Sequence, residues 1–454
     1  MPAFRKNDVV LDSVKRLMRI GATNNLVNLL QKQHPADLAQ VFNDLHEKDR
    51  VAAFTMLVER HGRLAMEALS ELGPESGASL LAGRPPEEIA RLAREIPTDD
   101  AAVLIDRLPN ELSASVLEIM RRKEPSQVEG LLEYADQTAG RIMNPHVFAL
   151  PEDVTAGEAI AALQRSRDVE MVFYLYVVDG RGHLVGVVSL RRLLLVAPET
   201  PLLRIMTTDI LSAQVHTDQE EVARQVASYN LLAIPVVDPE NKLVGIITVD
   251  DVIDVIKDEA TEDIYRLAGV AGYDTVGVPA RDSLRKRLPW LVVNLGTAFL
   301  AASVVKLFSA TISQVVALAV FMPIVAGMGG NAATQTLTVI VRGIALGEVT
   351  WANSRQALVK ETLVGLGNGV TLGLVAAGGA WLLQGDPVLG GILGLAMVIN
   401  LLVAAIAGTL IPLGLRALKV DPALASSVFI TTLTDVFGFL SFLGLGTFFL
   451  AYLR

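Results

Sequence analysis

One carboxylate lies inside an apolar stretch near the C-terminal end of this 454-residue chain. Asp435 is the only acidic residue after Pro422, and the run around it is otherwise apolar or hydroxylic and long enough to cross a bilayer. An ionised Asp at mid-membrane costs roughly 2.5 to 3.5 kcal/mol on insertion scales, so such groups usually face a bundle interior or a water-filled path. The sequence therefore favours a cation pathway; the alternatives are a protonated carboxyl bonded to a neighbouring helix, or one solvated near a membrane surface.

A second group of oxygen-bearing side chains ends another apolar run. Residues 322–336 combine a proline, three glycines and a series of amides and hydroxyls, and the polar cluster comprises Asn331, Thr334, Gln335 and Thr338. We expect irregular backbone here, which persists at membrane depth only where it packs against protein or lines water. Small residues alone are typical of a helix-packing face. The polar cluster instead favours a pore lining, because each side chain adds an oxygen ligand.

A third set of carboxylates lies on one predicted helix, between residues 249 and 267. Its apolar positions keep one face buried, and six acidic residues recur at steps of three and four: Asp251, Asp254, Asp258, Glu259, Glu262 and Asp263. Only Lys257 and Arg266 are available locally to neutralise them. Two interpretations remain open, a solvated acidic face and a divalent-cation site that bridges to another domain.

The elements that position these groups fall into two very different halves. The hydrophobic fraction is 51%, yet no apolar run before Leu288 approaches the roughly 20 residues that span hydrocarbon. Five such runs follow, near 288–308, 312–330, 357–383, 388–415 and 420–452. Residues 283–454 carry ten basic and five acidic side chains in a chain of net charge −10, so the preceding part is strongly acidic. This acidity excludes nucleic acid as a partner and favours small cations.

Charges that flank the apolar runs predict the topology. Basic residues precede the first run and lie between the second and third and between the fourth and fifth, whereas the opposite connections hold only Lys306 and Asp386. By the positive-inside rule the N-terminal part is cytoplasmic, the C-terminus lies outside, and the protein is a multi-pass protein of the cell membrane. No cleavable signal peptide is expected at Met1. The absence of cysteine fits a cytosolic domain and excludes thiolate metal sites.

The cytosolic half consists of a helical part and an internal repeat. Turn signals with proline beside acidic or Asn residues predict a stack of short helices, an all-α superhelix, over residues 1–136. The repeat follows at offsets of 59 to 63 residues, and each copy predicts a helix, a strand, a turn, a second strand and an amphipathic helix. Its matching segments are Arg141-Ile-Met with Arg204-Ile-Met, Tyr176-Val-Val-Asp with Pro235-Val-Val-Asp, and Leu184-Val-Gly with Leu243-Val-Gly.

This repeat resembles a tandem pair of CBS domains, a module that commonly binds adenine nucleotides through a Ser/Thr-x-x-Asp pattern after the last strand. The second copy has that pattern as Thr248-Val-Asp-Asp251, whereas the first reads Ser189-Leu-Arg-Arg192. The resemblance implies ATP binding through the second copy, with Arg191 or Arg192 near phosphate and one arm of the usual ribose contact missing.

The whole chain resembles the MgtE family of magnesium channels and transporters. The resemblance rests on the Pro-x-x-x-Gly-Met-Gly-Gly-Asn segment that ends at Asn331, on Arg342-Gly-Ile-Ala-Leu-Gly-Glu348 and on the Thr-Thr-x-x-Asp segment that ends at Asp435. The domain order agrees: a helical regulatory domain (1–136), an α/β CBS pair (137–200 and 201–250), an acidic connecting helix (251–282) and a five-helix transmembrane pore domain (283–454).

What the resemblance implies is a homodimer in the lipid bilayer that takes up Mg²⁺ down its electrochemical gradient, through a pore lined by the second and fifth spans. Asp435 is then the pore carboxylate, accompanied by Thr431, Ser427, Asn331 and Thr334. The expected regulatory metal ligands are Asp251, Asp254, Glu259, Glu262 and Asp263, with Asp99 and Asp100 as partners in the N-terminal domain. Cytosolic Mg²⁺ would bridge these carboxylates and close the pore, and their mutual repulsion would open it. Asn230 departs from the family pattern, in which relatives often carry Asp.

Two rival functions compete with the channel, and one class is not expected. An exchanger that couples a divalent cation to Na⁺ or H⁺ would have the same polar residues in its spans. The residues also do not decide which of Mg²⁺, Co²⁺, Mn²⁺ and Ni²⁺ is transported. A membrane-anchored nucleotide sensor needs no intramembrane ligands, so Asp435 counts against it. An enzyme is not expected, because the six histidines are scattered without ligand spacing and no nucleophile motif or phosphate-cradling loop is present.

Overall fold

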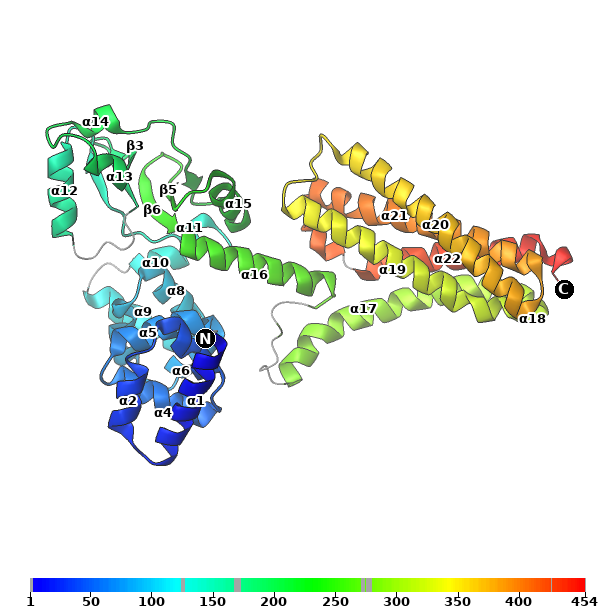
Figure 1. The fold of residues 1–454 in the computed structure, drawn as a ribbon, viewed down its shortest axis with the longest axis horizontal. Helices are drawn as coiled ribbons and strands as arrows, with labels where there is room; N and C mark the ends of the chain where they lie inside the picture. Colours follow the sequence, from blue (N-terminus) through cyan, green and yellow to red (C-terminus); the bar gives the residue numbers. More distant parts are fainter. Residues whose placement is uncertain are drawn as a thin grey trace. The chain divides into compact units, whose positions relative to one another are not determined.

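The computed structural model describes residues 3–123, 127–166, 173–270, 274, 280–425 and 427–453, with side chains for all of these except 3–6, 123, 424, 425 and 427. The chain forms two compact units, Met1–Ile256 and Lys257–Arg454. Figure 1 gives the element labels, and the grey traces are outside the described part.

The N-terminal part of the first unit is helical, as predicted. Prolines occupy the first position of three of its helices, where their fixed φ suits a helix start and no N–H bond is lost. Phe42 and Phe54 are fully buried and meet edge to face at 6.4 Å in its core. The elements are α1 (Ala3–Arg19), α2 (Thr23–Leu30), α3 (Pro35–Asn43), α4 (Glu47–Val58), α5 (Gly62–Leu72), α6 (Pro74–Leu81), α7 (Pro86–Leu92), η1 (Ala93–Glu95), α8 (Thr98–Asp106), α9 (Asn110–Lys123) and α10 (Gln127–Leu132).

The internal repeat forms two equivalent three-stranded sheets, which confirms the predicted CBS pair. In each sheet the first two strands are parallel and the last two antiparallel, in the orders β1-β2-β3 and β4-β5-β6. The first copy comprises α11 (Ala139–Ile142), β1 (Ala149–Pro151), α12 (Ala156–Arg165), β2 (Tyr174–Val178), β3 (Leu184–Ser189) and α13 (Leu190–Leu194). The second comprises α14 (Leu202–Ile205), β4 (Ala213–Gln214), α15 (Gln219–Tyr229), β5 (Ala233–Val237) and β6 (Leu243–Thr248).

The two copies are joined by a reciprocal exchange of methionines. Met143 packs on Gly245 of the second sheet, and Met206 packs on Gly186 of the first. A Cβ on Gly245 would lie 2.8 Å from Cγ of Met143, and one on Gly186 would lie 2.9 Å from Cγ of Met206. Both strands therefore require glycine at this point, which explains why the Arg-Ile-Met and Leu-Val-Gly motifs recur together.

Each copy also closes its β-turn with an aspartate. In the first, Asp179 accepts the backbone N–H of His183 at 2.9 Å and lies 2.8 Å from the ring nitrogen of the same residue. In the second, Asp238 accepts the backbone N–H of Lys242 at 2.8 Å. Such Asx turns satisfy backbone donors that the strands leave open.

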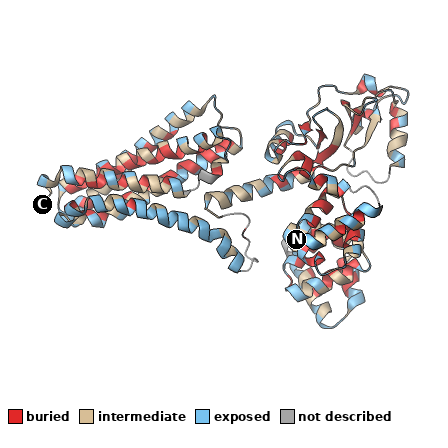
Figure 2. Ribbon diagram, turned by 180° about the vertical axis from the view of Figure 1, so that it is seen from behind, coloured by how far each residue is buried: buried red, intermediate tan, exposed pale blue. Residues whose placement is uncertain are grey.

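The second unit contains five helices that are long and apolar enough to cross a membrane, which confirms the five predicted spans. They are α17 (Ala280–Leu307), α19 (Ala317–Ala345), α20 (Ser354–Gln384), α21 (Pro387–Ala417) and α22 (Ser427–Phe448). Shorter elements are α18 (Ser309–Gln314), η2 (Pro422–Ala425) and η3 (Leu450–Tyr452). The helix α21 packs against α19, α20 and α22 and is the most buried of the five, whereas α17 is almost entirely exposed in Figure 2.

One expectation for this unit is wrong. The sequence predicts irregular backbone between residues 322 and 336 and an end of the span at 330, but α19 continues as one helix to Ala345 with Pro323 inside it. A proline early in a helix removes one hydrogen bond without ending the helix when neighbouring helices pack against it. Two of the glycines that follow are used for close packing, since Gly329 meets Asn400 and Gly330 meets Thr431.

Candidate cation path and acidic cluster

Asp435 lies half-buried in the middle of α22. Within the described residues, its carboxylate has no hydrogen-bond or ion-pair partner. Thr431 precedes it by four residues and so lies one turn earlier on the same side of the helix. Ser427 is the first residue of α22, but its side chain is outside the described part of the chain. A carboxylate without a protein partner in a spanning helix retains its full capacity to bind a cation.

The polar face of α19 lies against this part of α22. A Cβ added to Gly330 would lie 3.4 Å from the methyl group of Thr431, so the two helices touch beside Asn331. Asn331 and Thr334 are both exposed in the single chain and lie one turn apart. The contact of α19 and α22 thus places Asn331 near Thr431, and Thr334 and Asp435 each lie about one turn farther along their own helices.

The hydroxyl groups of this face are oriented by their own helices. Thr431 donates to the carbonyl oxygen of Val428 at 3.2 Å, and Thr334 donates to that of Gly330 at 3.0 Å. This back-bonding uses the hydroxyl hydrogen and leaves the oxygen lone pairs as acceptors. The threonines therefore present oxygen, rather than hydrogen, to a cation or to its hydration water.

The acidic cluster forms in the first unit, between α8 and α16 (Val249–Leu267). Asp99 is only 8% exposed, and its Oδ1 has no hydrogen-bond partner among the described residues. Burial, and next the charges of Asp251 and Asp100, raise the pKa of Asp99 well above its usual range. Burial also raises the pKa of Asp251 to about 6, with Asp250 and Asp254 adding to the effect and the Thr248 hydroxyl opposing it.

The structure therefore brings the predicted N-domain residue Asp99 together with the predicted helix residue Asp251. A carboxylate whose pKa is raised by burial and by a neighbouring carboxylate is stabilised by a divalent cation, which offsets both effects. The predicted sensing residues are nevertheless not gathered at one point. In the described ranges, no group of three or more His, Asp or Glu side chains lies close enough to hold one metal ion.

The remaining predicted ligands lie farther along α16. Asp254 is exposed, Glu259 is half-buried, and Glu262 forms an ion pair with Arg266. Burial raises the pKa of Asp263, against the opposing charge of Arg266. These three later carboxylates belong to the second unit, whereas Asp251 and Asp254 belong to the first.

Comparison with known proteins accounts for almost the whole chain. The family model described as divalent cation transporter matches residues 322–445, the MgtE intracellular N domain matches 33–137, and the CBS domain matches 139–199 and 203–258. The magnesium transporter MgtE of Thermus thermophilus is 37% identical over 449 residues, which cover 95% of this chain and 96% of the relative. Its namesake from Bacillus subtilis is 34% identical over 435 residues, with 96% of each chain covered. The chain belongs to the MgtE family.

Solved structures agree with this assignment over the N-terminal half of the chain. The soluble part of a magnesium transporter is 31% identical with a TM-score of 0.51, and the match covers 56% of this chain and 99% of that one. The cytosolic domain of the Mg²⁺ channel MgtE in complex with ATP is 35% identical with a TM-score of 0.51, covering 54% and 99%. The MgtE resemblance seen in the sequence is confirmed: this is a membrane protein of a magnesium transporter family rather than an enzyme.

In this MgtE-family chain two of the predicted nucleotide residues, Thr248 and Asp251, are in direct contact. The Thr248 hydroxyl donates to Oδ2 of Asp251 at 2.7 Å, and the Thr248 backbone N–H lies 3.3 Å from the same oxygen. At the equivalent point of the first copy, the Ser189 hydroxyl instead accepts the backbone N–H of Arg192, and the side chains of Arg191 and Arg192 are exposed. Asp251 therefore belongs to both the predicted nucleotide site and the acidic cluster.

Asn230, the departure from the family pattern, has a backbone role. It ends α15 in the left-handed conformation with φ of 52°. Asn tolerates this conformation better than most residues, because its short polar side chain bonds locally.

A contact at the far end of α16 is not foreseen from the sequence. Arg266 pairs with Asp421, at the start of the segment that leads into α22, as well as with Glu262. The next residue, Leu267, packs on a buried cluster that contains Leu337 of α19 and Ile430 of α22. The spacing of Glu262 and Arg266 predicts a pair within one helix, but no local pattern indicates Asp421, 155 residues away.

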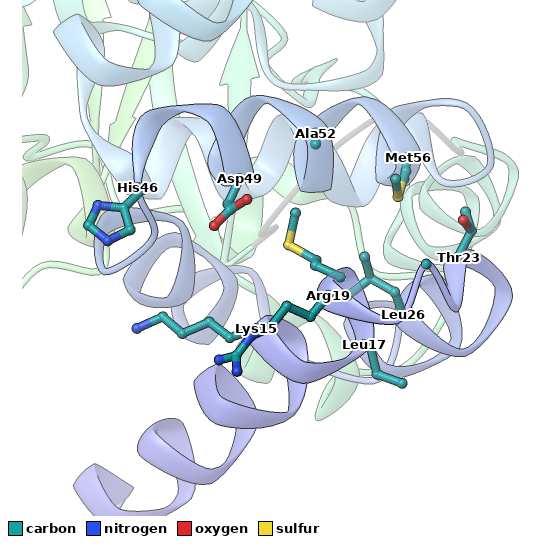
Figure 3. Close-up of a pocket in the computed structure, with 11 residues that line it drawn as sticks. Lys15, Leu17, Arg19, Thr23, Leu26, His46, Asp49, Ala52 and Met56 are labelled. Atoms are coloured by element: carbon teal, nitrogen blue, oxygen red, sulfur yellow. The ribbon is translucent and has the colours of Figure 1, made fainter.

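A cavity of about 500 Å³ lies between α1, α2 and α4. Figure 3 shows the polar ends of Lys15, Arg19, His46 and Asp49 around it. None of the predicted site residues lines it.

Proposed function

We propose that this protein is a Mg²⁺-selective channel or transporter that mediates Mg²⁺ uptake down its electrochemical gradient, with Asp435 as the carboxylate of the path. The observation that carries this proposal is the position of Asp435 in the middle of a spanning helix, without a partner among the described residues. Desolvating an unpaired carboxylate is expensive unless water or a cation accompanies it.

A homodimer would place two Asp435 side chains, related by two-fold symmetry, around one ion. Mg²⁺ demands octahedral oxygen ligands at about 2.0 to 2.1 Å and loses its water reluctantly. Carboxylates that hold the ion through its waters avoid this dehydration. The lone pairs of Thr431 and Thr334, the amide of Asn331 and the hydroxyl of Ser427 are suited to accept those waters. The exposure of Asn331 and Thr334 in the single chain is consistent with a path completed by a second subunit.

The orientation of the protein follows from its basic flanks. Arg and Lys concentrate before α17, between α19 and α20, and between α21 and α22. The first unit is then cytoplasmic and the C-terminus lies outside the cell. Uptake therefore delivers Mg²⁺ to the side on which the acidic cluster lies.

Cytosolic Mg²⁺ would act as the regulator at this cluster. The free Oδ1 of Asp99 and the nearby charge of Asp251 fit a divalent cation, since both carboxylates are otherwise held in unfavourable surroundings. Asp100, Asp254, Glu259, Glu262 and Asp263 complete the proposed set, and they act as several separate sites. If each of five sites contributed about 1 kcal/mol of differential binding, the sum would approach the roughly 5.5 kcal/mol that moves a population from 1:99 to 99:1.

The helix α16 is the element that would transmit this signal. Asp251 lies in its first turn, and Arg266 and Leu267 end it in contact with residues next to α22 and α19. A helix is stiff over its 19 residues, so a displacement at one end reaches the other. Neutralising Asp251 and Asp99 would hold α16 in place, and removing the cation would release it.

ATP is proposed as a further ligand of the second CBS copy, through Thr248 and Asp251, with Arg191 or Arg192 near phosphate. The arrangement of Thr248 and Asp251 suits a ribose, because their carboxylate and hydroxyl oxygens, at the end of β6 and the start of α16, are acceptors for ribose hydroxyl groups. A relative crystallised with ATP supports this ligand.

Ion flux into liposomes tests the proposed path. We expect wild-type protein to carry Mg²⁺ when Mg²⁺ on the cytosolic face is low and to close when it is high. Asp435→Asn should abolish the flux, whereas Asp386→Asn, a matched loss of charge at the N-cap of α21, should retain it. Flux that persists without the Asp435 charge would refute the path, and flux that ignores cytosolic Mg²⁺ would refute the gate. A dependence of flux on a Na⁺ or H⁺ gradient would show an exchanger.

A further inference from the structure

Asn400 is a fully buried amide at the centre of the membrane-spanning unit. It belongs to α21, its exposed fraction is 0%, and its Nδ2 donates to the backbone carbonyl oxygen of Val325 in α19 at 2.9 Å. Its Oδ1 has no hydrogen-bond partner among the described residues. A half-satisfied amide in a membrane interior is costly, and a leucine of similar size would avoid that cost.

Two glycines make room for this amide. A Cβ on Gly329 of α19 would lie 2.9 Å from Cγ of Asn400 and closer still to Nδ2. A Cβ on Gly438 of α22 would lie 2.7 Å from Nδ2. The carboxamide of Asn400 therefore fills the junction of α19, α21 and α22, with backbone on both sides and no space for adjustment.

This junction lies beside the candidate path. Gly329 precedes Gly330, which touches Thr431, and it is two residues before Asn331. Gly438 follows Asp435 by three residues, about one turn of α22. The side chain of Asn400 thus contacts both helices that carry the polar face, without belonging to that face.

We propose that Asn400 is a positioning residue that sets the separation of α19 and α22 at the level of the path, and thereby its selectivity among divalent cations. This inference rests on the proposed function and deepens it. The hydrogen bond to Val325 is directional and fixes α19 relative to α21, which an apolar side chain of the same volume cannot do. Because Mg²⁺ and Ca²⁺ differ in ligand distance and in how readily they lose water, a path of fixed width discriminates between them.

The first test measures helix separation without any transport. The chain has no cysteine, so the double variant Gly330→Cys, Thr431→Cys introduces one pair at the contact of α19 and α22. We expect Asn400→Leu to change the rate of disulfide formation in this pair at least about fivefold. Thr409→Val is the matched control, because Thr409 is equally buried in α21 but donates only to Ala405 of its own helix, at 2.8 Å. Equal rates with Asn400→Leu and with the control would overturn the inference.

The second test measures selectivity. We expect the ratio of Ca²⁺ to Mg²⁺ flux to rise about tenfold in Asn400→Leu and to stay unchanged in Thr409→Val. A merely structural role would lower both fluxes together and leave their ratio unchanged, and that result would overturn the inference. If the wild type carries no divalent cation, the proposed function fails and the selectivity claim falls with it, while the disulfide rates still decide the positioning claim.

A double-mutant cycle tests the contact between Gly329 and Asn400. Gly329→Ala introduces a methyl group against the Asn400 amide, whereas Gly327→Ala on the same helix meets nothing within 4 Å. We expect Gly329→Ala alone to disturb selectivity and Asn400→Ala in the same chain to relieve part of that effect, since residues in contact are not additive. Additive effects, or equal effects of Gly327→Ala and Gly329→Ala, would contradict the proposed contact.

Discussion

Replacing Asp251 by Asn should stabilise the first unit in the absence of Mg²⁺ and remove its response to Mg²⁺. Burial raises the pKa of Asp251 from its ordinary 3.8 to about 6. The folded protein therefore disfavours the charged carboxylate by at most about 3 kcal/mol at neutral pH, which corresponds to about a hundredfold in an equilibrium. Asn retains an oxygen that accepts the Thr248 hydroxyl but carries no charge.

The direction of the pKa shift of Asp251 determines how the free energy of unfolding depends on pH. Because the folded-state pKa lies above the unfolded one, ionisation of Asp251 lowers the free energy of unfolding as pH rises from about 4 to 6, and the full loss is present above 6. The Asn variant should therefore exceed the wild type in stability at pH 7 and match it near pH 4. In the wild type, saturating Mg²⁺ should recover the loss, and at 100 times its Kd a ligand stabilises by about 2.7 kcal/mol.

Hydrogen exchange in the full-length protein measures the change in local stability around Asp251. We expect peptides from α8 and the first half of α16 to exchange up to about a hundredfold more slowly in Asp251→Asn than in wild type, both in EDTA. Asp258→Asn is the matched control, because it removes an exposed carboxylate from the same helix. If Asp251→Asn exchanges as fast as wild type in EDTA, or still responds fully to Mg²⁺, the repulsion that we place between Asp99 and Asp251 does not govern this unit.

Three further outcomes follow from single contacts. The hydrogen bond from His183 holds the pKa of Asp179 at about 2, so the contribution of this hydrogen bond to the free energy of unfolding is lost as pH falls from about 4 to 2. The variant Asp179→Asn should therefore lack this acid transition in circular dichroism. Arg266→Ala frees Asp421, and flux measurements should show weaker closure by Mg²⁺ with an unchanged melting temperature. Arg141→Leu removes the 3.0 Å ion pair between the buried Arg141 and the exposed Asp106 of α8, and urea unfolding should show a loss of about 2 kcal/mol in the free energy of unfolding.

Periodicity and repetition make much of the fold predictable. The repeat can be recognised because both copies use the same glycine and methionine contact, so the two motifs that form this contact each occur twice in the sequence. The five spans are visible because a bilayer demands long apolar runs. Asp435 and Asp99 can be selected because a carboxylate is conspicuous in an apolar run or at the start of a helix. These are local properties of the chain, so they can be recognised from the sequence alone.

Contacts between distant segments are not predictable in this way. The glycines and proline after Met322 suggest irregular backbone, yet they lie within one helix, because composition cannot reveal whether a glycine meets water or a neighbouring helix. Asn400 lies in a long apolar run, and nothing nearby indicates that it faces Val325 and two glycines. The pairing of Arg266 with Asp421 is likewise invisible in sequence. In each case the sequence does not reveal which distant segment packs against the residue.

Asp99, whose Oδ1 has no hydrogen-bond partner among the described residues, and Asp435 pose different physical problems, and their surroundings indicate different affinities. Asp99 is buried beside like charges, so a cation bound there gains both attraction and relief of repulsion and should be held firmly. Asp435 is half-buried, and no like-charged partner is found for it among the described residues, so a hydrated ion gains less and leaves readily, as conduction requires. We therefore expect cytosolic Mg²⁺ to close the path at concentrations well below those that saturate flux. Closure that required concentrations above the saturation of flux would contradict this order.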